Sequence, residues 1–192
     1  MKIRTIAVIG AGVLGREIAY AAVSAGYTTI IEDISRARLD KALAWIAGRL
    51  EANSRDASSR NLSPASGIEE ALAQADLIIE TTADEMEMKL ELITLFDKFA
   101  KPGAIFASSG SLSITEMAEV TYRAERCIGM RFTDSLAQGS VLELVRGLET
   151  SQEAVDLCSA VGLCMRRKVI VVSESERSVD GHAEQKAASA RN

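Results

Sequence analysis

The chain has 192 residues, 47% of them hydrophobic and 26% charged, which is typical of a globular protein with a sizeable core. Its net charge of −5 gives no basic surface, so nucleic acid is not an expected partner. No apolar run approaches the roughly 20 residues of a membrane span, so no membrane partner is expected either. The three cysteines lack metal-site spacing, so no metal is predicted. Their odd number and apolar surroundings predict reduced core residues in a cytoplasmic protein: Cys127, Cys158 and Cys164.

The first predicted elements enclose a glycine-rich turn. Apolar residues 6–9 predict a strand, residues 13–25 a helix, and residues 28–31 a second strand. The second strand is followed by an acidic residue, Asp33, at the distance of about 20 residues that a dinucleotide-binding fingerprint requires. A strand, a glycine turn, a helix, a strand and an acid in this order predict a dinucleotide site.

Each glycine of the turn has its own expected role. Gly10 permits the tight turn, Gly12 lets the backbone approach a pyrophosphate, and Gly15 lets the helix pack closely on the strand. The phosphates are expected on the N–H groups at the start of the helix. The residues expected to contact the cofactor here are Gly10, Ala11, Gly12, Val13, Leu14 and Gly15.

Asp33 also indicates which dinucleotide is bound. A carboxylate at this place suits the free 2′-hydroxyl of NAD and repels the 2′-phosphate of NADP. Arg36 and Arg38 follow closely and could in principle take that phosphate, but a solvated helix start is the preferred interpretation of both. The sequence therefore predicts NAD as the cofactor.

The rest of the chain alternates between helical and strand patterns. The predicted helices cover residues 35–51, 68–74, 85–100, 113–118 and 151–161, and the predicted strands cover 61–63, 76–80, 104–107, 126–132, 141–145 and 165–172. This alternation predicts an α/β fold with a Rossmann-type, doubly wound, mostly parallel sheet in a single domain over residues 1–172. Residues 173–192 are polar and predict a flexible tail. The core stripe expected in the helix 85–100 consists of Met88, Leu92, Leu95, Phe96 and Phe99.

These elements, in this order, resemble the NAD-binding domain of the 3-hydroxyacyl-CoA dehydrogenase family. The resemblance covers about residues 6–172 and rests on several blocks: residues 8–15, 75–80, 95–99, 105–108, 112–115, 129–132 and 141–145. It implies an NAD-dependent oxidoreductase of fatty acid metabolism. The implied substrate is a small hydroxy or carbonyl compound, with a CoA ester as one candidate.

The resemblance also implies the active-site residues, with one substitution. The family's general base is a histidine held by a glutamate, and the block that contains this histidine corresponds to residues 129–135. The histidine position carries Arg131 and an asparagine position carries Asp134, while the glutamate is kept as Glu143. The one histidine of the chain, His182, lies in the polar tail and cannot replace the base by its position.

Three further positions follow from the same resemblance. The family's serine lies in a turn that is one residue shorter here, so it falls on Ser109 or Ser111, and Ser111 is preferred. The family's acid and lysine near the cofactor correspond to Asp84 and Lys89. The family's second, helical domain would begin where this chain stops, and the apolar surface that such a domain would cover predicts a homodimer.

Arg131 leaves two functions open. Arginine stays protonated at physiological pH and cannot accept the proton of an alcohol, although it can stabilise an alkoxide and should form a two-pronged pair with Glu143. General-base catalysis typically contributes about 10² to 10⁴-fold, so alcohol oxidation should be slowed by that order. The preferred hypothesis is an oxidoreductase of this family with an altered active site, and the alternative is a non-catalytic NAD-binding or interaction protein of the same fold. A flavoprotein is disfavoured because the chain lacks room for a second substrate domain.

Overall fold

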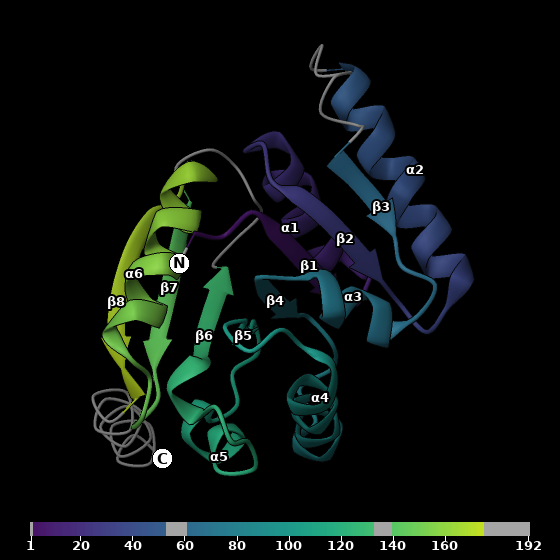
Figure 1. The fold of residues 1–192 in the computed structure, drawn as a ribbon. Coiled ribbons are helices and arrows are strands. Elements are labelled where there is room, and N and C mark those ends of the chain that lie inside the picture. Colours follow the sequence, from purple (N-terminus) through teal and green to yellow (C-terminus); the bar gives the residue numbers. More distant parts are fainter. Residues whose placement is uncertain (1, 53–60, 133–139, 175–192) are drawn as a thin grey trace, which may run out of the picture.

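The apolar runs of the sequence form one sheet in the computed structural model, which describes residues 2–52, 61–132 and 140–174. The described part holds eight strands in the order β3-β2-β1-β4-β5-β6-β7-β8 (Figure 1). The strands are β1 (Thr5–Ile9), β2 (Thr28–Glu32), β3 (Leu62–Pro64), β4 (Leu77–Glu80), β5 (Ile105–Ser108), β6 (Cys127–Phe132), β7 (Val141–Arg146) and β8 (Lys168–Ser173). Only the β6–β7 pair among these is antiparallel. The expected Rossmann-type, mostly parallel sheet is confirmed.

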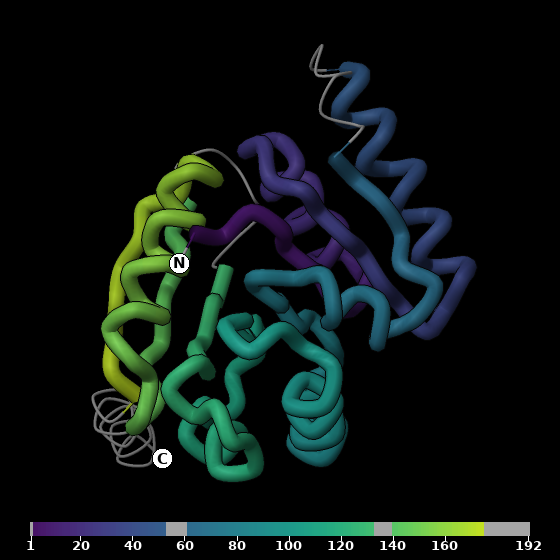
Figure 2. The backbone as a smooth tube through the Cα atoms, in the orientation of Figure 1, coloured from purple at the N-terminus to yellow at the C-terminus, as the bar shows by residue number. Residues whose placement is uncertain are grey.

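Helices cover both faces of this sheet. They are α1 (Val13–Ser24), α2 (Arg36–Ala52), α3 (Ile68–Gln74), α4 (Met86–Phe99), α5 (Ile114–Ala118) and α6 (Gln152–Cys164), with a 3-10 turn, η2, over Ala124–Arg126. Residues of α1, α2 and α6 share one buried cluster, and residues of α3, α4 and α5 share another. The backbone trace in Figure 2 shows β1, in purple, inside the sheet between β2 and β4.

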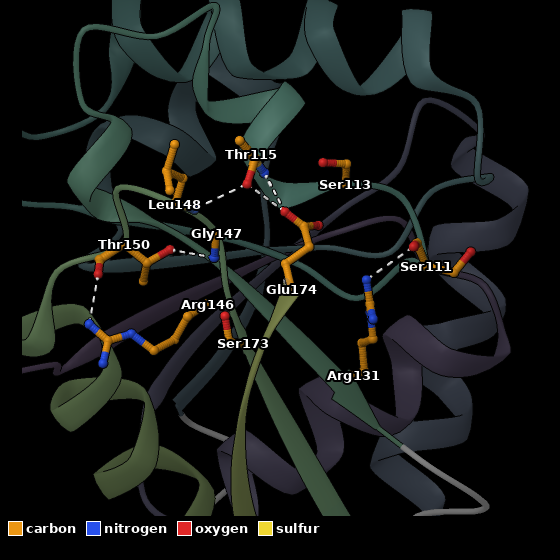
Figure 3. Close-up of a pocket in the computed structure, with 10 residues that line it drawn as sticks. All are labelled: Ser111, Ser113, Thr115, Arg131, Arg146, Gly147, Leu148, Thr150, Ser173 and Glu174. Carbon is orange, nitrogen blue, oxygen red and sulfur yellow. Dashed lines mark hydrogen bonds between the residues drawn. The ribbon is translucent and has the colours of Figure 1, made fainter. Parts of the chain in front are cut away.

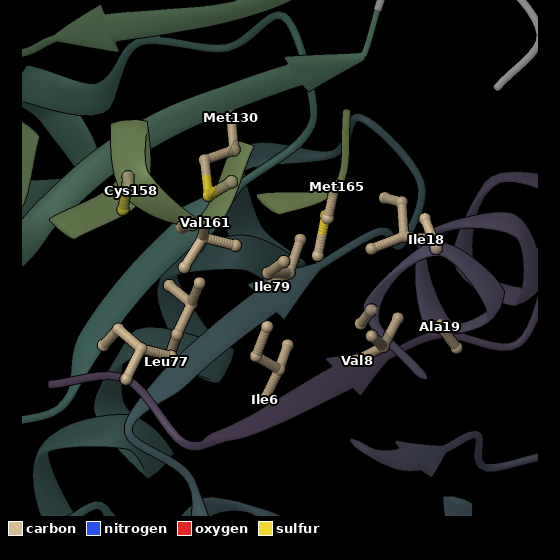
Figure 4. Packing of buried hydrophobic residues seen from close by; sticks show 14 of the residues in the cluster. Ile6, Val8, Ile18, Ala19, Leu77, Ile79, Met130, Cys158, Val161 and Met165 are labelled. Carbon is tan, nitrogen blue, oxygen red and sulfur yellow. The ribbon is translucent and has the colours of Figure 1, made fainter. Parts of the chain in front are cut away.

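The central strands are buried on both faces, so their side chains alternate between the two clusters. Ile6 and Val8 of β1 point towards α1 and α6, while Ala7 and Ile9 point towards α3 and α4. On the first face, Ile18 of α1 packs in the same cluster as Ile6 and Val8 (Figure 4). Burial on both sides explains why these strands read as continuous apolar runs rather than as alternating patterns.

Two sequence expectations about burial were wrong. Met88 is 39% exposed, and the fully buried residues of α4 are Lys89, Ile93 and Phe96. The other four residues of the expected stripe do belong to or pack against the second buried cluster, and Lys89 is buried beside an acidic partner described below. Cys164 is exposed at the end of α6, whereas the other two cysteines are buried.

The described structure continues past the domain boundary expected at residue 172. Strand β8 includes Ser173, and the carboxylate of Glu174 accepts hydrogen bonds from the N–H groups of Ile114 and Thr115 in α5, at 2.7 and 3.0 Å. The remainder of the expected tail, from residue 175, lies outside the described residues. None of the helices in the described ranges is both long and apolar enough to cross a membrane.

We expect a homodimer because β8 leaves an apolar edge at the side of the sheet. Among the described strands β8 has a neighbour on one side only, and Ile170 and Val171 are partly exposed. An exposed apolar edge strand tends to pair with another chain. Val171→Lys should therefore shift the protein towards monomer in sedimentation velocity at micromolar concentration. Val120→Lys, at a partly exposed valine after α5, is the matched control and should leave the assembly unchanged. A monomer for the unmutated protein would contradict the prediction.

Candidate functional site

The glycine-rich turn between β1 and α1 is tightly packed at Gly10 and Gly15 and open at Gly12. Gly10 has a φ of +103°, and its N–H donates to the carbonyl of Glu32 at 2.8 Å. A Cβ at Gly15 would lie 1.8 Å from the carbonyl oxygen of Gly10, so only glycine fits there. Gly12 begins α1 without a side-chain cap, and a Cβ added to it would meet nothing within 4 Å. The first N–H groups of α1 are therefore accessible, as a bound pyrophosphate requires.

Asp33 lies directly against this turn. Its Oδ2 accepts from the N–H of Ala11 at 2.8 Å, and its Oδ1 accepts from the N–H of Ser35 at 2.7 Å and from Nε of Arg38 at 3.2 Å. The side chain of Asp33 is 6% exposed. A carboxylate has about four acceptor positions, so room for about one more hydrogen bond remains. The expected ribose contact stays a prediction, and Arg38 pairs with Asp33 rather than being only solvated.

A buried ion pair holds the carboxyl ends of β4 and β5 together. Nζ of Lys89 lies 2.6 Å from Oε2 of Glu80, and both side chains are 0% exposed. The hydroxyl of Ser108 donates to the same oxygen at 2.8 Å, while the hydroxyl and N–H of Thr82 donate to Oε1 at 2.5 Å. A charge buried in this way is tolerated only when it is paired and hydrogen-bonded. Lys89 is thus enclosed, and its implied contact with the cofactor stays a prediction.

The same lysine reaches a second carboxylate, which holds Ser111. Nζ of Lys89 lies 3.4 Å from Oδ1 of Asp84, whose Oδ2 accepts from the N–H of Ser111 at 2.8 Å and from its hydroxyl at 2.6 Å. A Cβ at Gly110 would lie 1.9 Å from Oδ1 of Asp84, so the turn fits closely on the carboxylate. Partial burial raises the pKa of Asp84, but the hydrogen bonds from Ser111 and the charge of Lys89 outweigh it and lower the pKa below its ordinary value.

Most of the N–H donors of Arg131 form hydrogen bonds with backbone carbonyls. Its Nε donates to the carbonyl of Gly110 at 2.7 Å, and its Nη2 donates to that of Leu112 at 3.2 Å. Nη2 also donates to the carbonyl of Ser111 at 3.0 Å (Figure 3). Arg131 faces Glu143 across the β6–β7 pair, and Nη1 lies 3.6 Å from Oε1 of that residue. The expected ion pair between Arg131 and Glu143 therefore forms. The expected two-pronged geometry was wrong, because Nε and Nη2 of Arg131 donate to carbonyls of the turn and only Nη1 faces Glu143. The two side chains are 12% and 13% exposed.

A cavity of about 990 Å³ lies beside this cluster. It is lined by Ser111, Ser113, Thr115, Arg131, Arg146, Gly147, Leu148, Thr150, Ser173 and Glu174 (Figure 3). Its size is within the range of small-molecule sites. The guanidinium of Arg146 is positioned by hydrogen bonds to the carbonyl of Thr150 at 3.1 Å and to the side chain of Gln152 at 3.0 Å, and both acceptors are neutral, so its positive charge remains.

The structure arranges the sequence-predicted residues in two neighbouring groups. The glycine turn and Asp33 form the first group. The second is a connected set of side chains that contains Asp84, Lys89, Ser111, Arg131 and Glu143. The two groups meet because β1, β4 and β5 run parallel, which brings Ile9, Glu80 and Ser108 into line. Asp134 and His182 lie outside the described residues.

Sequence reasoning missed Glu80, Ser108 and Glu174. A signal for the first two was present, since each is the polar residue that ends an apolar strand, and the carboxyl ends of neighbouring parallel strands meet at one edge of a sheet. Glu174 gave no such signal because it lies in a polar segment. Its contact with α5 depends on where β8 ends in space.

Comparisons with known proteins agree with this geometry. The sequence matches the family described as "3-hydroxyacyl-CoA dehydrogenase, NAD binding domain" over residues 5–175. It is 34% identical to the 3-hydroxybutyryl-CoA dehydrogenase of Bradyrhizobium diazoefficiens, a match covering 90% of this chain and 61% of that protein. It is also 34% identical to the probable 3-hydroxybutyryl-CoA dehydrogenase of Bacillus subtilis, with 91% and 64% covered.

A solved structure shows the same fold. The (S)-3-hydroxybutyryl-CoA dehydrogenase from Ralstonia eutropha superposes with a TM-score of 0.82 at 30% identity, covering 90% of this chain and 64% of that one. The chain thus spans less than two thirds of the length of these three relatives.

The buried ion pair yields a stability prediction. Lys89→Met would leave Glu80 charged without its cation, so the free energy of unfolding should fall by about 3–5 kcal/mol, measured by urea denaturation. Lys41→Met, at an exposed lysine of α2, is the control and should change it by no more than about 0.5 kcal/mol. Adding Glu80→Gln to Lys89→Met should recover part of the loss. Equal stabilities of Lys89→Met and Lys41→Met would contradict the account.

Proposed function

We propose that this chain, which belongs to the 3-hydroxyacyl-CoA dehydrogenase family, is an NAD-dependent oxidoreductase with an altered active site. The observation that carries the proposal is the accessible glycine turn next to the cluster of Asp84, Ser111 and Arg131. A dinucleotide seated on that turn extends along the carboxyl ends of the parallel strands, where ligands of such sheets bind. This is the edge at which Ser111 and Arg131 lie.

The residues present fit NAD as the cofactor. The uncapped start of α1 offers N–H groups to a pyrophosphate, and Asp33 closes the turn by accepting from Ala11. Bound NAD supplies the acceptor or the donor of a hydride. The protein supplies the positions: the glycine turn places the phosphates, and the Ser111 turn forms the wall of the cavity beside the reacting end.

The substrate class that the proposal favours is a 3-hydroxyacyl-CoA or the matching 3-oxoacyl-CoA. Two of the relatives carry the name 3-hydroxybutyryl-CoA dehydrogenase. The family resemblance implies that Ser111 and Glu143 stand where the family has a serine and a glutamate. The altered part is Arg131, a cation that holds the Ser111 turn and cannot act as a general base. Chemistry should therefore be slower than with a histidine base, by about 10² to 10⁴-fold.

A non-catalytic NAD-binding protein is the second candidate. One observation favours it: the donors of Arg131 go to three carbonyls and its remaining nitrogen faces Glu143, so little of the guanidinium is left for a substrate. Such a protein would keep the cofactor site and lose turnover.

Calorimetry with NADH, followed by absorbance at 340 nm, tests the proposal. We expect NADH to bind at micromolar concentration, and we expect slow NADH formation from NAD with 3-hydroxybutyryl-CoA and slow NADH consumption with acetoacetyl-CoA. Binding without any change in absorbance would favour the non-catalytic candidate. Failure to bind NADH would reject both.

The preference for NAD over NADP should depend on the charge of Asp33. Asp33→Asn keeps an oxygen for the N–H of Ala11 but removes the negative charge, so the ratio of the NADPH and NADH dissociation constants should fall about tenfold, or about 1.4 kcal/mol. Asp40→Asn, which removes an exposed charge paired with Arg36, is the control and should leave the ratio unchanged. Equal affinity of the unmutated protein for both cofactors would refute the role of Asp33.

A further inference from the structure

We infer that Asp84 accepts the proton of the substrate hydroxyl in this altered site and that it does so through Ser111. The inference deepens the proposed function and rests on it, because it assigns the proton acceptor of the same oxidation. The hydroxyl of Ser111 donates to Oδ2 of Asp84 at 2.6 Å. A serine that donates to a carboxylate keeps lone pairs with which it can accept a hydrogen bond from an alcohol.

The transfer balances without another reactant. The carbinol carbon is oxidised as its C–H electron pair leaves as hydride to NAD. The hydroxyl proton of the substrate moves to Oγ of Ser111, and the proton that Ser111 held moves to Oδ2 of Asp84. Ser111 ends the step unchanged, and Asp84, whose side chain is 40% exposed, can release the proton to water.

Three other carboxylates near the turn are less suited to this role. Glu80 is 0% exposed and binds Lys89. Glu143 lies opposite Arg131, and its Oε1 is 3.6 Å from Nη1 of that permanent cation. Glu174 already accepts from two N–H groups and the Thr115 hydroxyl of α5. Of these described carboxylates, Asp84 alone combines exposure with a bond to the hydroxyl of Ser111.

Burial raises the pKa of Asp84, but the hydrogen bonds from Ser111 and the charge of Lys89 outweigh this and keep the carboxylate ionised, so that it can accept a proton. Lys89 of α4 lies 3.4 Å away with Glu80 of β4 behind it, Glu85 follows in sequence, and Arg131 of β6 lies across the turn. The pKa of Asp84 is lowered, so its carboxylate is charged throughout the neutral range. Protonation blocks it only when the pH falls below the ordinary range of aspartate. The acid limb of the rate should therefore lie below pH 4, whereas a histidine base would place it near 6.5.

Arg131 acts here as a positioning residue. It binds the carbonyls of Gly110, Ser111 and Leu112, while Asp84 binds the N–H and the hydroxyl of Ser111. The turn is thus held from both sides, and the hydroxyl of Ser111 is kept on the carboxylate. Arg131 cannot itself act as a base, and by holding the turn it fixes the position of Ser111 relative to Asp84.

The test compares Asp84→Asn and Ser111→Ala with the matched control Glu85→Gln, which neutralises an exposed neighbour. Oxidation of 3-hydroxybutyryl-CoA by NAD is followed at 340 nm from pH 5 to pH 9, and NADH affinity is measured by calorimetry. We expect kcat to fall at least tenfold in Asp84→Asn and in Ser111→Ala, and to stay unchanged in Glu85→Gln. The double variant should lose no more than either single variant, because two groups in one proton path act as a unit. NADH affinity should stay within about twofold, whereas the cofactor contact implied by the family resemblance predicts a weaker affinity for Asp84→Asn.

The outcomes separate this inference from the proposed function. A pH-independent rate from pH 5 to pH 9 in the unmutated protein supports the relay, and a limb near 6.5 overturns it. Turnover of Asp84→Asn equal to that of Glu85→Gln overturns the relay but leaves the proposed function standing. NADH binding without any turnover in the unmutated protein overturns both.

A readout that is independent of turnover comes from carboxyl ¹³C NMR. Because the hydrogen bonds of Ser111 lower the pKa of Asp84, that pKa should lie below its ordinary value of 3.8 in the unmutated protein. It should move upwards in Ser111→Ala, which loses the hydroxyl bond, and should stay unchanged in Glu85→Gln. An Asp84 pKa that is equal in the unmutated protein and in Ser111→Ala would show that the hydroxyl does not bind the carboxylate in solution, and would overturn the relay.

Discussion

The buried contact between Lys89 and Glu80 is the interaction on which the candidate site depends. A lysine ammonium without water is stable only beside an anion and further acceptors, and here Glu80 lies at 2.6 Å with Ser108 at 3.4 Å. Glu80 and Ser108 are register partners at the ends of β4 and β5. The ion pair therefore joins the ends of β4 and β5 at the edge of the sheet where the turns around Asp84 and Ser111 begin, and it accounts for the burial of the charged Lys89 in α4.

From this pair, charges of alternating sign continue through the site. Glu80 is followed by Lys89, then Asp84, then across the Ser111 turn by Arg131, and finally by Glu143. An arginine at position 131 is compatible with this series, because it lies between one carboxylate and three carbonyl oxygens. Guanidinium suits the place physically, since its planar donors can bind several carbonyls at once while its charge stays permanent. Arg131 therefore has a structural role, because it holds the turn that carries Ser111.

The sequence predicted most of the fold because the fold follows from local pattern. Apolar runs and glycines predicted the order of strands and helices, and the glycine turn with Asp33 predicted a cofactor site. The site beyond the cofactor was less predictable. The apolar stripe of α4 gave no sign of a buried lysine, because a lysine is buried only where distant residues, here Glu80 and Ser108, neutralise and bind it. The Arg131 fork was missed for a similar reason, since backbone carbonyls are competing acceptors at every position and a sequence pattern does not show where they point.

Because Arg131 is a permanent cation and Asp84 is the proton acceptor, the rates of oxidation and reduction should depend differently on pH. A histidine base changes its charge near neutral pH, so it can take a proton in oxidation and return it in reduction. Here the cation is permanent and the carboxylate is held ionised, because Ser111 and Lys89 lower the pKa of Asp84. Oxidation draws on the ionised form, which dominates in the neutral range, whereas reduction through the same path draws on the scarce protonated form. The reductive rate constant should consequently rise as the pH falls towards the pKa of Asp84, while the oxidative one stays level over the neutral range.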